Sequence, residues 1–193
     1  MSTQERPRFV ALFDCSPAES PPWVRTACVE AGLFFVDNDD IATQMSKSQE
    51  AQKAILELNQ GFRENEAMAP HYSAALDKVA GGQDRLAVYS VSWFLYGVRP
   101  AVAILDFQPL EDEVKKARAG PKKVPEEKLQ EYLKTYRTKL TDLALGHVGQ
   151  ERTLILPLGM LDSQKAALAA EHIKKHLTLP PDPNLKFKSG VRG

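Results

Sequence analysis

Residues 9–34, FVALFDCSPAESPPWVRTACVEAGLF, decide the fold of this chain. The unbroken apolar run over residues 9–13 predicts a buried strand of a parallel sheet, because such a strand is covered on both faces. Apolar side chains then recur at helical spacing over residues 23–31, and Gly32 supplies a helix stop. A strand, a polar loop and a helix in this order are typical of the first unit of an α/β domain.

The rest of the chain continues this alternation of strands and helices. We therefore predict an α/β fold with a mainly parallel sheet and helices on both faces. Residues 1–179 are expected to form a single domain, and the proline-containing residues 180–193 an extended tail. Further strands are predicted at 33–36, 86–91, 101–107 and 152–158, and helices at 41–62, 71–79, 93–96, from Pro109, from Pro125, and from Asp162 or Ser163 to Leu177.

Composition excludes several classes of partner. Lys plus Arg and Asp plus Glu number 25 each in 193 residues, so no overall positive field favours nucleic acid or an anionic membrane. No stretch approaches the roughly 20 apolar residues of a membrane span, and the first residues lack the apolar core of a signal peptide. We expect a cytoplasmic protein in which Cys15 and Cys28 are buried free thiols, and a homo-oligomer stays open.

The loop after the first strand is where many α/β proteins hold a phosphate. Such a loop uses glycines and a Lys or Arg, but residues 15–23 contain neither. Pro17, Pro21 and Pro22 have no N–H to donate, and Glu19 would repel an anion. The hydroxyl of Ser20 and that of the neighbouring Ser16 leave a weak anion site as the alternative. These residues favour a rigid strand-to-helix turn.

The order of landmarks resembles the sulfotransferase family of the P-loop superfamily. DCSPAESPP at residues 14–22 stands where that family has G-S-P-R-S-G-T-[ST], and VEAGL at 29–33 matches its "AG" before the second strand. Leu58-Asn59, the segment 83–85, the segment 105–109 and LTLP at 177–180 also resemble family landmarks. The resemblance spans nearly the whole chain and implies a P-loop-like three-layer sandwich.

The departures from the family fall on its functional positions. Family enzymes bind 3′-phosphoadenosine 5′-phosphosulfate through a basic loop residue and a loop glycine, which here correspond to Ala18 and Ser20. The two residues that meet the 3′-phosphate correspond to Phe107 and Lys115. The resemblance thus implies a degenerate donor loop over Ser16, Pro17, Ala18, Glu19 and Ser20, with Arg25, Arg85 and Lys115 as the remaining candidate donor-binding residues.

Three functions remain open at this point. The first is a noncatalytic, sulfotransferase-like protein that binds no cofactor and acts as a binding or assembly component. The second is an active sulfotransferase with an atypical donor site, which would use 3′-phosphoadenosine 5′-phosphosulfate and an unknown acceptor. The third is a relative of nucleotide or nucleoside kinases, which usually require Gly and Lys in the first loop.

Few other residues suggest chemistry. His71 and Glu64 are the candidates for acid–base catalysis, although a surface position is the favoured interpretation of His71. His172 and His176 have metal-ligand spacing on the last helix but no third ligand, so we expect an exposed basic helix end there rather than a metal site. The acidic turn at residues 37–40 is expected to cap a helix rather than hold a cation.

Aromatic residues gather in one segment. For these side chains core packing is the default interpretation, and a ligand wall or a partner surface is the alternative. We take the cluster as the candidate site for a protein partner. Its members are Tyr89, Trp93, Phe94 and Tyr96.

Overall fold

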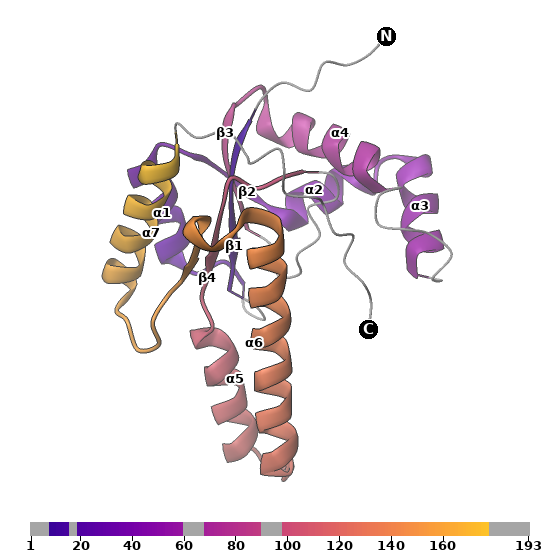
Figure 1. Cartoon of the computed structure of the whole chain (residues 1–193). Helices are drawn as coiled ribbons and strands as arrows, with labels where there is room; N and C mark the ends of the chain where they lie inside the picture. The colour runs from indigo at the N-terminus through magenta and orange to yellow at the C-terminus, as the bar shows by residue number, and fades with distance from the viewer. Residues whose placement is uncertain (1–7, 16–18, 60–67, 90–97, 178–193) are drawn as a thin grey trace.

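The computed structural model describes residues 8–15, 19–59, 68–89 and 98–177. Its centre is a five-stranded sheet in the order β2-β3-β1-β4-β5, and every paired strand is parallel. The architecture confirms the predicted α/β fold, with a parallel sheet and helices on both faces that form a three-layer sandwich (Figure 1). The strands are β1 (Phe9–Asp14), β2 (Phe34–Asp37), β3 (Arg85–Tyr89), β4 (Val102–Leu105) and β5 (Thr153–Ile155).

Alternate side chains of the central strand β1 enter two different cores. Ala11 and Phe13 pack with α1 (Pro22–Ala31) and α7 (Asp162–His176), which lie side by side on one face of the sheet (Figure 1). Val10 and Leu12 pack with α2 (Asn38–Met45), α3 (Gln49–Asn59) and α4 (Ala69–Ala80) on the other face. Both faces of β1 are therefore buried, as its continuous apolar run predicts.

A two-helix hairpin is inserted between β4 and β5. Its helices are α5 (Gln108–Ala119) and α6 (Glu126–Val148), which pack against each other and project away from the sheet (Figure 1). Leu110 and Val114 of α5 form a third core with Leu133 and Leu140 of α6. The base of the hairpin joins this core to Ala103 and Leu105 of β4, so the hairpin is anchored on the sheet at one end.

One predicted helix is two helices in the structure. The segment predicted as a single helix over residues 41–62 divides into α2 and α3, with a break at residues 46–48. Ser48 starts the second helix, because its hydroxyl accepts a hydrogen bond from the N–H of Ala51 at 3.3 Å. The acidic turn caps α2 as expected, since Asp37 Oδ1 accepts from the N–H of Asp39 at 3.1 Å.

The last strand is shorter than predicted. The apolar run 152–158 forms strand only over Thr153–Ile155, preceded by the 3₁₀ turn η2 (Gln150–Arg152). The N–H of Leu156 still donates to the carbonyl of Leu105 at 2.9 Å, and Pro157, which has no N–H, ends the pairing. The predicted helix at 93–96 and the tail at 180–193 lie outside the described residues.

Gly32 and Gly146 should respond in opposite ways to replacement by alanine. Gly32 ends α1 at φ 68°, and a Cβ there would meet nothing within 4 Å, so only the left-handed backbone opposes the change. Gly32→Ala should destabilise the protein by about 1–2 kcal/mol. Gly146 lies inside α6 with equally open space, so Gly146→Ala should stabilise it by about 0.5–1 kcal/mol. Urea unfolding of both variants measures the difference, and a stability change of the same sign in both would contradict this reading of the Gly32 backbone.

Candidate functional site

The carboxyl ends of β1 and β4 meet beside the first loop. These strands are neighbours in register, with Asp14 opposite Leu105, and the N–H of Asp106 donates to the carbonyl of Asp14 at 3.0 Å. Asp14 and Asp106 are both buried. In open parallel sheets this edge, where the strand order reverses, is the usual place for a ligand. The candidate site is therefore built on two buried carboxylates.

A lysine from the last helix completes this group. Lys165 Nζ lies 2.7 Å from Asp106 Oδ2, and the two side chains are only 5% and 1% exposed. The other carboxylate oxygen, Asp106 Oδ1, accepts from the N–H of Gln108 at 3.0 Å, which fixes the start of α5. The ammonium also lies 5.9 Å from the ring of Trp23 in α1. We call Asp14, Cys15, Asp106 and Lys165 the sheet-edge cluster.

Burial and the carboxylates of this cluster disfavour ionisation of Cys15 and of the nearby Tyr89. Burial raises the pKa of the Cys15 thiol well above its usual value, and the carboxylates of Asp106 and Asp14 raise it further, while Lys165 lowers it. Burial likewise raises the pKa of Tyr89, to which Cys15 and the nearby carboxylates add. Cys15 is therefore a buried neutral thiol, as the sequence predicts, and has no activated nucleophile's environment.

The described part of the first loop offers few donors to an anion. Pro22 is the first residue of α1 and has no N–H, and the N–H of Val24 donates to the carbonyl of Pro21 at 3.0 Å. At most two of the first four N–H groups of this helix can face a ligand. Ser20 Oγ is buried and has no hydrogen-bond partner among the described residues, whereas Glu19 is exposed. Ser16, Pro17 and Ala18 lie outside those residues.

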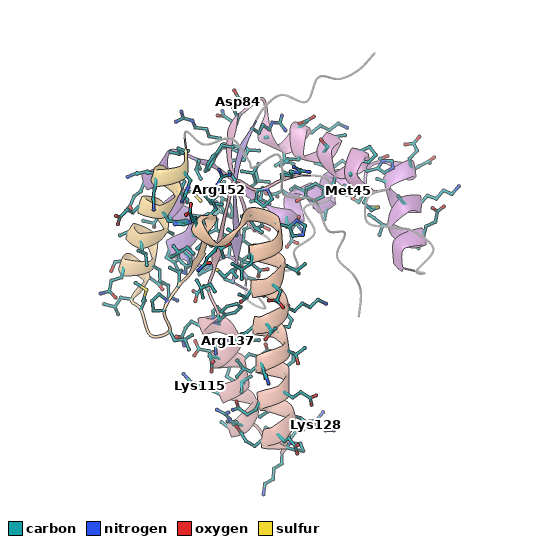
Figure 2. All side chains as sticks on the ribbon, in the orientation of Figure 1. Met45, Asp84, Lys115, Lys128, Arg137 and Arg152 are labelled. Atoms are coloured by element: carbon teal, nitrogen blue, oxygen red, sulfur yellow. The ribbon has the colours of Figure 1, made fainter. Side chains whose placement is uncertain are left out.

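The basic residues proposed for the donor lie in separate places. Arg25 stacks on the ring of Phe35, with 4.2 Å from its guanidinium carbon to the ring centroid. Arg85 begins β3, so it lies at the amino edge of the sheet, opposite the edge that carries the first loop. Lys115 is on the projecting hairpin, 3.5 Å from the carboxylate of Asp112 (Figure 2). These three cations do not form one group.

Of the two acid–base candidates, the structure describes only His71. His71 lies in the first turn of α4, half-buried, and Glu64 is outside the described residues. The described residues include no group of three or more His, Cys, Asp or Glu side chains able to hold a metal ion. Within the same residues no helix has the length and apolarity to cross a membrane.

The proposed aromatic partner surface is wrong. Tyr89 is the last residue of β3 and is only 2% exposed, because it belongs to the core that the sheet forms with α1 and α7. The part of the chain that the structure describes contains no aromatic cluster at this place. Trp93, Phe94 and Tyr96 are outside that part. Core packing, the default interpretation, holds for Tyr89.

Comparison with known proteins gives only a distant likeness. No protein-family model matches this chain. No curated protein matches it either. Among solved structures it is similar to a gluconokinase from Sinorhizobium meliloti 1021, with 12% identity, a TM-score of 0.41, and coverage of 88% of this chain and 93% of that one. A similarity this distant assigns no activity to the chain, and it does not single out sulfotransferases.

Sequence reasoning missed the charged members of the sheet-edge cluster. A signal for the carboxylates was present, since two of the three interior strands end the same way, FVALFD at residues 9–14 and AVAILD at 101–106. An acidic residue directly after a buried run marks the carboxyl edge of a parallel sheet. Lys165 left no such signal, because its place depends on how α7 packs against the sheet.

Proposed function

We propose that this protein has a P-loop-like fold that has lost binding of a phosphate-containing donor and acts as a noncatalytic binding or assembly component. One observation carries the proposal: the cation of the sheet-edge cluster is already neutralised by Asp106, 2.7 Å away, and a second buried carboxylate lies beside it. A nucleotide phosphate placed there would have to compete with Asp106 for Lys165 and would lie next to a second buried carboxylate. Repulsion between a phosphate and a carboxylate held close together in a buried site costs on the order of several kcal/mol.

The donor of the resembling family does not fit these residues. A phosphosulfate nucleotide needs converging cations and free N–H groups, and the first loop supplies no cation over residues 15–23. The three remaining candidates lie on α1, at the amino edge of the sheet and on the hairpin. We therefore assign no step of sulfate transfer to this chain.

A kinase-like activity is the second candidate, and two observations at the first loop are compatible with it. Lys165 brings an ammonium to the edge where the first loop begins, close enough to Cys15 to lower the pKa of its thiol. Ser20 Oγ is a buried hydroxyl in that loop with no hydrogen-bond partner among the described residues. A nucleoside triphosphate that displaced Asp106 from Lys165 would gain one cation and one hydroxyl donor.

Isothermal titration separates these functions. We expect no binding of Mg-ATP or of adenosine 3′,5′-bisphosphate at ligand concentrations up to about 1 mM, where a dissociation constant of 1 mM corresponds to about 4 kcal/mol. Binding of ATP that Lys165→Met abolishes and Lys53→Met preserves would establish the kinase-like alternative. Micromolar binding of the bisphosphate would instead support a sulfotransferase and overturn the proposal.

A further inference from the structure

Two histidines lie in the last turns of α7, at its C-terminal end. His172 and His176 are four residues apart on α7, and their rings meet edge to face with 4.9 Å between centroids. Lys165 lies on the same side of the helix, seven residues before His172, because positions i, i+7 and i+11 share one face. The helix is thus attached at one end by an ion pair and at the other by the two rings, which we call the histidine pair.

The ring nitrogens of the histidine pair are poorly satisfied. His176 is only 3% exposed, and neither of its ring nitrogens has a hydrogen-bond partner within the described chain. Nε2 of His172 is also buried without a partner there. A neutral imidazole tolerates this burial far better than an imidazolium, whose two N–H groups would both need acceptors. The packed geometry therefore requires the neutral form.

The charges around the pair favour the same form. Burial lowers the pKa of both histidines below the usual value; the backbone of Arg152 raises the pKa of His172 in part, and the ammonium of Lys175 lowers the pKa of both. Arg152 of η2 also lowers the pKa of His176, whereas the backbone of Glu151 raises it. The neighbouring helix α1 offers the exposed Arg25 and Glu30 and the buried thiol of Cys28, and β4 has no ionisable side chain.

A bound metal ion explains these nitrogens less well. Two positive side chains, Lys175 and Arg152, lie close enough to lower the pKa of His176, and they would repel a cation in the same way. The described residues also contain no third side-chain ligand for the pair. Structural zinc sites use four ligands.

We propose that the histidine pair forms an acid-sensitive packing contact that holds the last turn of α7 against η2, and that its protonation releases this turn. In the unfolded or released state each histidine has an ordinary pKa of about 6.5. Because the pKa values are lowered when the turn is packed, the released state takes up protons first as the pH falls below that value. The packed turn is therefore stable above about pH 6.5 and loses stability progressively below it.

Hydrogen exchange across residues 168–177 tests this device on the full chain. Between about pH 7.5 and pH 5, after correction for intrinsic exchange rates, protection of this segment should fall by at least about tenfold, while residues 129–140 of α6 keep theirs. The double variant His172→Phe with His176→Phe keeps two packed rings that cannot titrate, so its protection should not depend on pH. The matched control His71→Phe should behave as the wild type.

Three outcomes would overturn the proposal. Protection of residues 168–177 in the wild type could stay constant with pH, or the double Phe variant could lose it as the wild type does. Zinc added at neutral pH could raise the protection of the wild type alone, which would make the pair a metal site. If the double variant fails to fold, the imidazole signals of the wild type decide by NMR, because midpoints at or above about 6.5 for both rings contradict the device.

Discussion

Replacing Lys165 with methionine should lower the free energy of unfolding by about 3–5 kcal/mol, the usual cost of removing one partner of a buried ion pair. Within the described residues, the substitution leaves the buried carboxylate of Asp106 with one hydrogen bond, the one from the N–H of Gln108. It also removes the positive charge of α7 that lies beside the two buried carboxylates, Asp14 and Asp106. Urea unfolding measures the loss from the shift in midpoint at constant slope.

A matched control separates this effect from the chemistry of Lys-to-Met replacement. Lys53 forms an ion pair with Glu57 at 4.0 Å on α3, but its side chain is 79% exposed. Lys53→Met should change stability by no more than about 0.5 kcal/mol, because exposed pairs contribute little. Equal effects of the two substitutions would mean that the Lys165 pair is not a buried pair in solution.

The double variant Lys165→Met with Asp106→Asn tests whether the charge or the volume matters. Asparagine keeps an oxygen that can accept from the N–H of Gln108, and it removes the uncompensated charge. Replacing a buried ion pair by groups of similar size is often close to neutral. We therefore expect most of the lost stability to return, and a double variant no more stable than the single one would assign the loss to packing rather than to charge.

Local patterns were sufficient to predict the sheet and most helices. The apolar runs ending in Asp14 and Asp106 are buried strands, and Gly32 ends α1 in the left-handed conformation expected of it. The break between α2 and α3 was missed because apolar spacing continues through it, while the hydroxyl of Ser48 ends the continuity of the backbone. A capping side chain outweighed periodicity at that point.

The site was harder to predict than the fold. Its two carboxylates follow strands and could have been found from the sequence, but Lys165 reaches them from 59 residues beyond Asp106. The histidine pair was identified by its spacing and interpreted as an exposed basic helix end, yet His176 is buried against η2. In both cases the packing of α7 decides, and helix spacing alone does not show which face is covered.

The second large effect should follow from truncating Phe13, which precedes the sheet-edge cluster on β1. Its ring is fully buried between the sheet and α1, and it meets the ring of Trp23 edge to face at 5.9 Å. Phe13→Ala should cost about 3–5 kcal/mol, since the cavity cannot collapse in the central strand of a sheet packed on both faces. Urea unfolding gives the loss directly.

Phe34→Ala is the control, because it removes the same ring from the edge strand β2. Phe34 is 42% exposed, so less apolar area returns to water and no closed cavity forms. We expect a loss of about 1 kcal/mol or less at this position. A central strand should lose more stability on removal of a buried ring than an edge strand loses on removal of a partly exposed one. Similar losses at Phe13 and Phe34 would therefore contradict the central position of β1. They would also contradict the placement of Asp14 and Cys15 at the carboxyl end of a central strand.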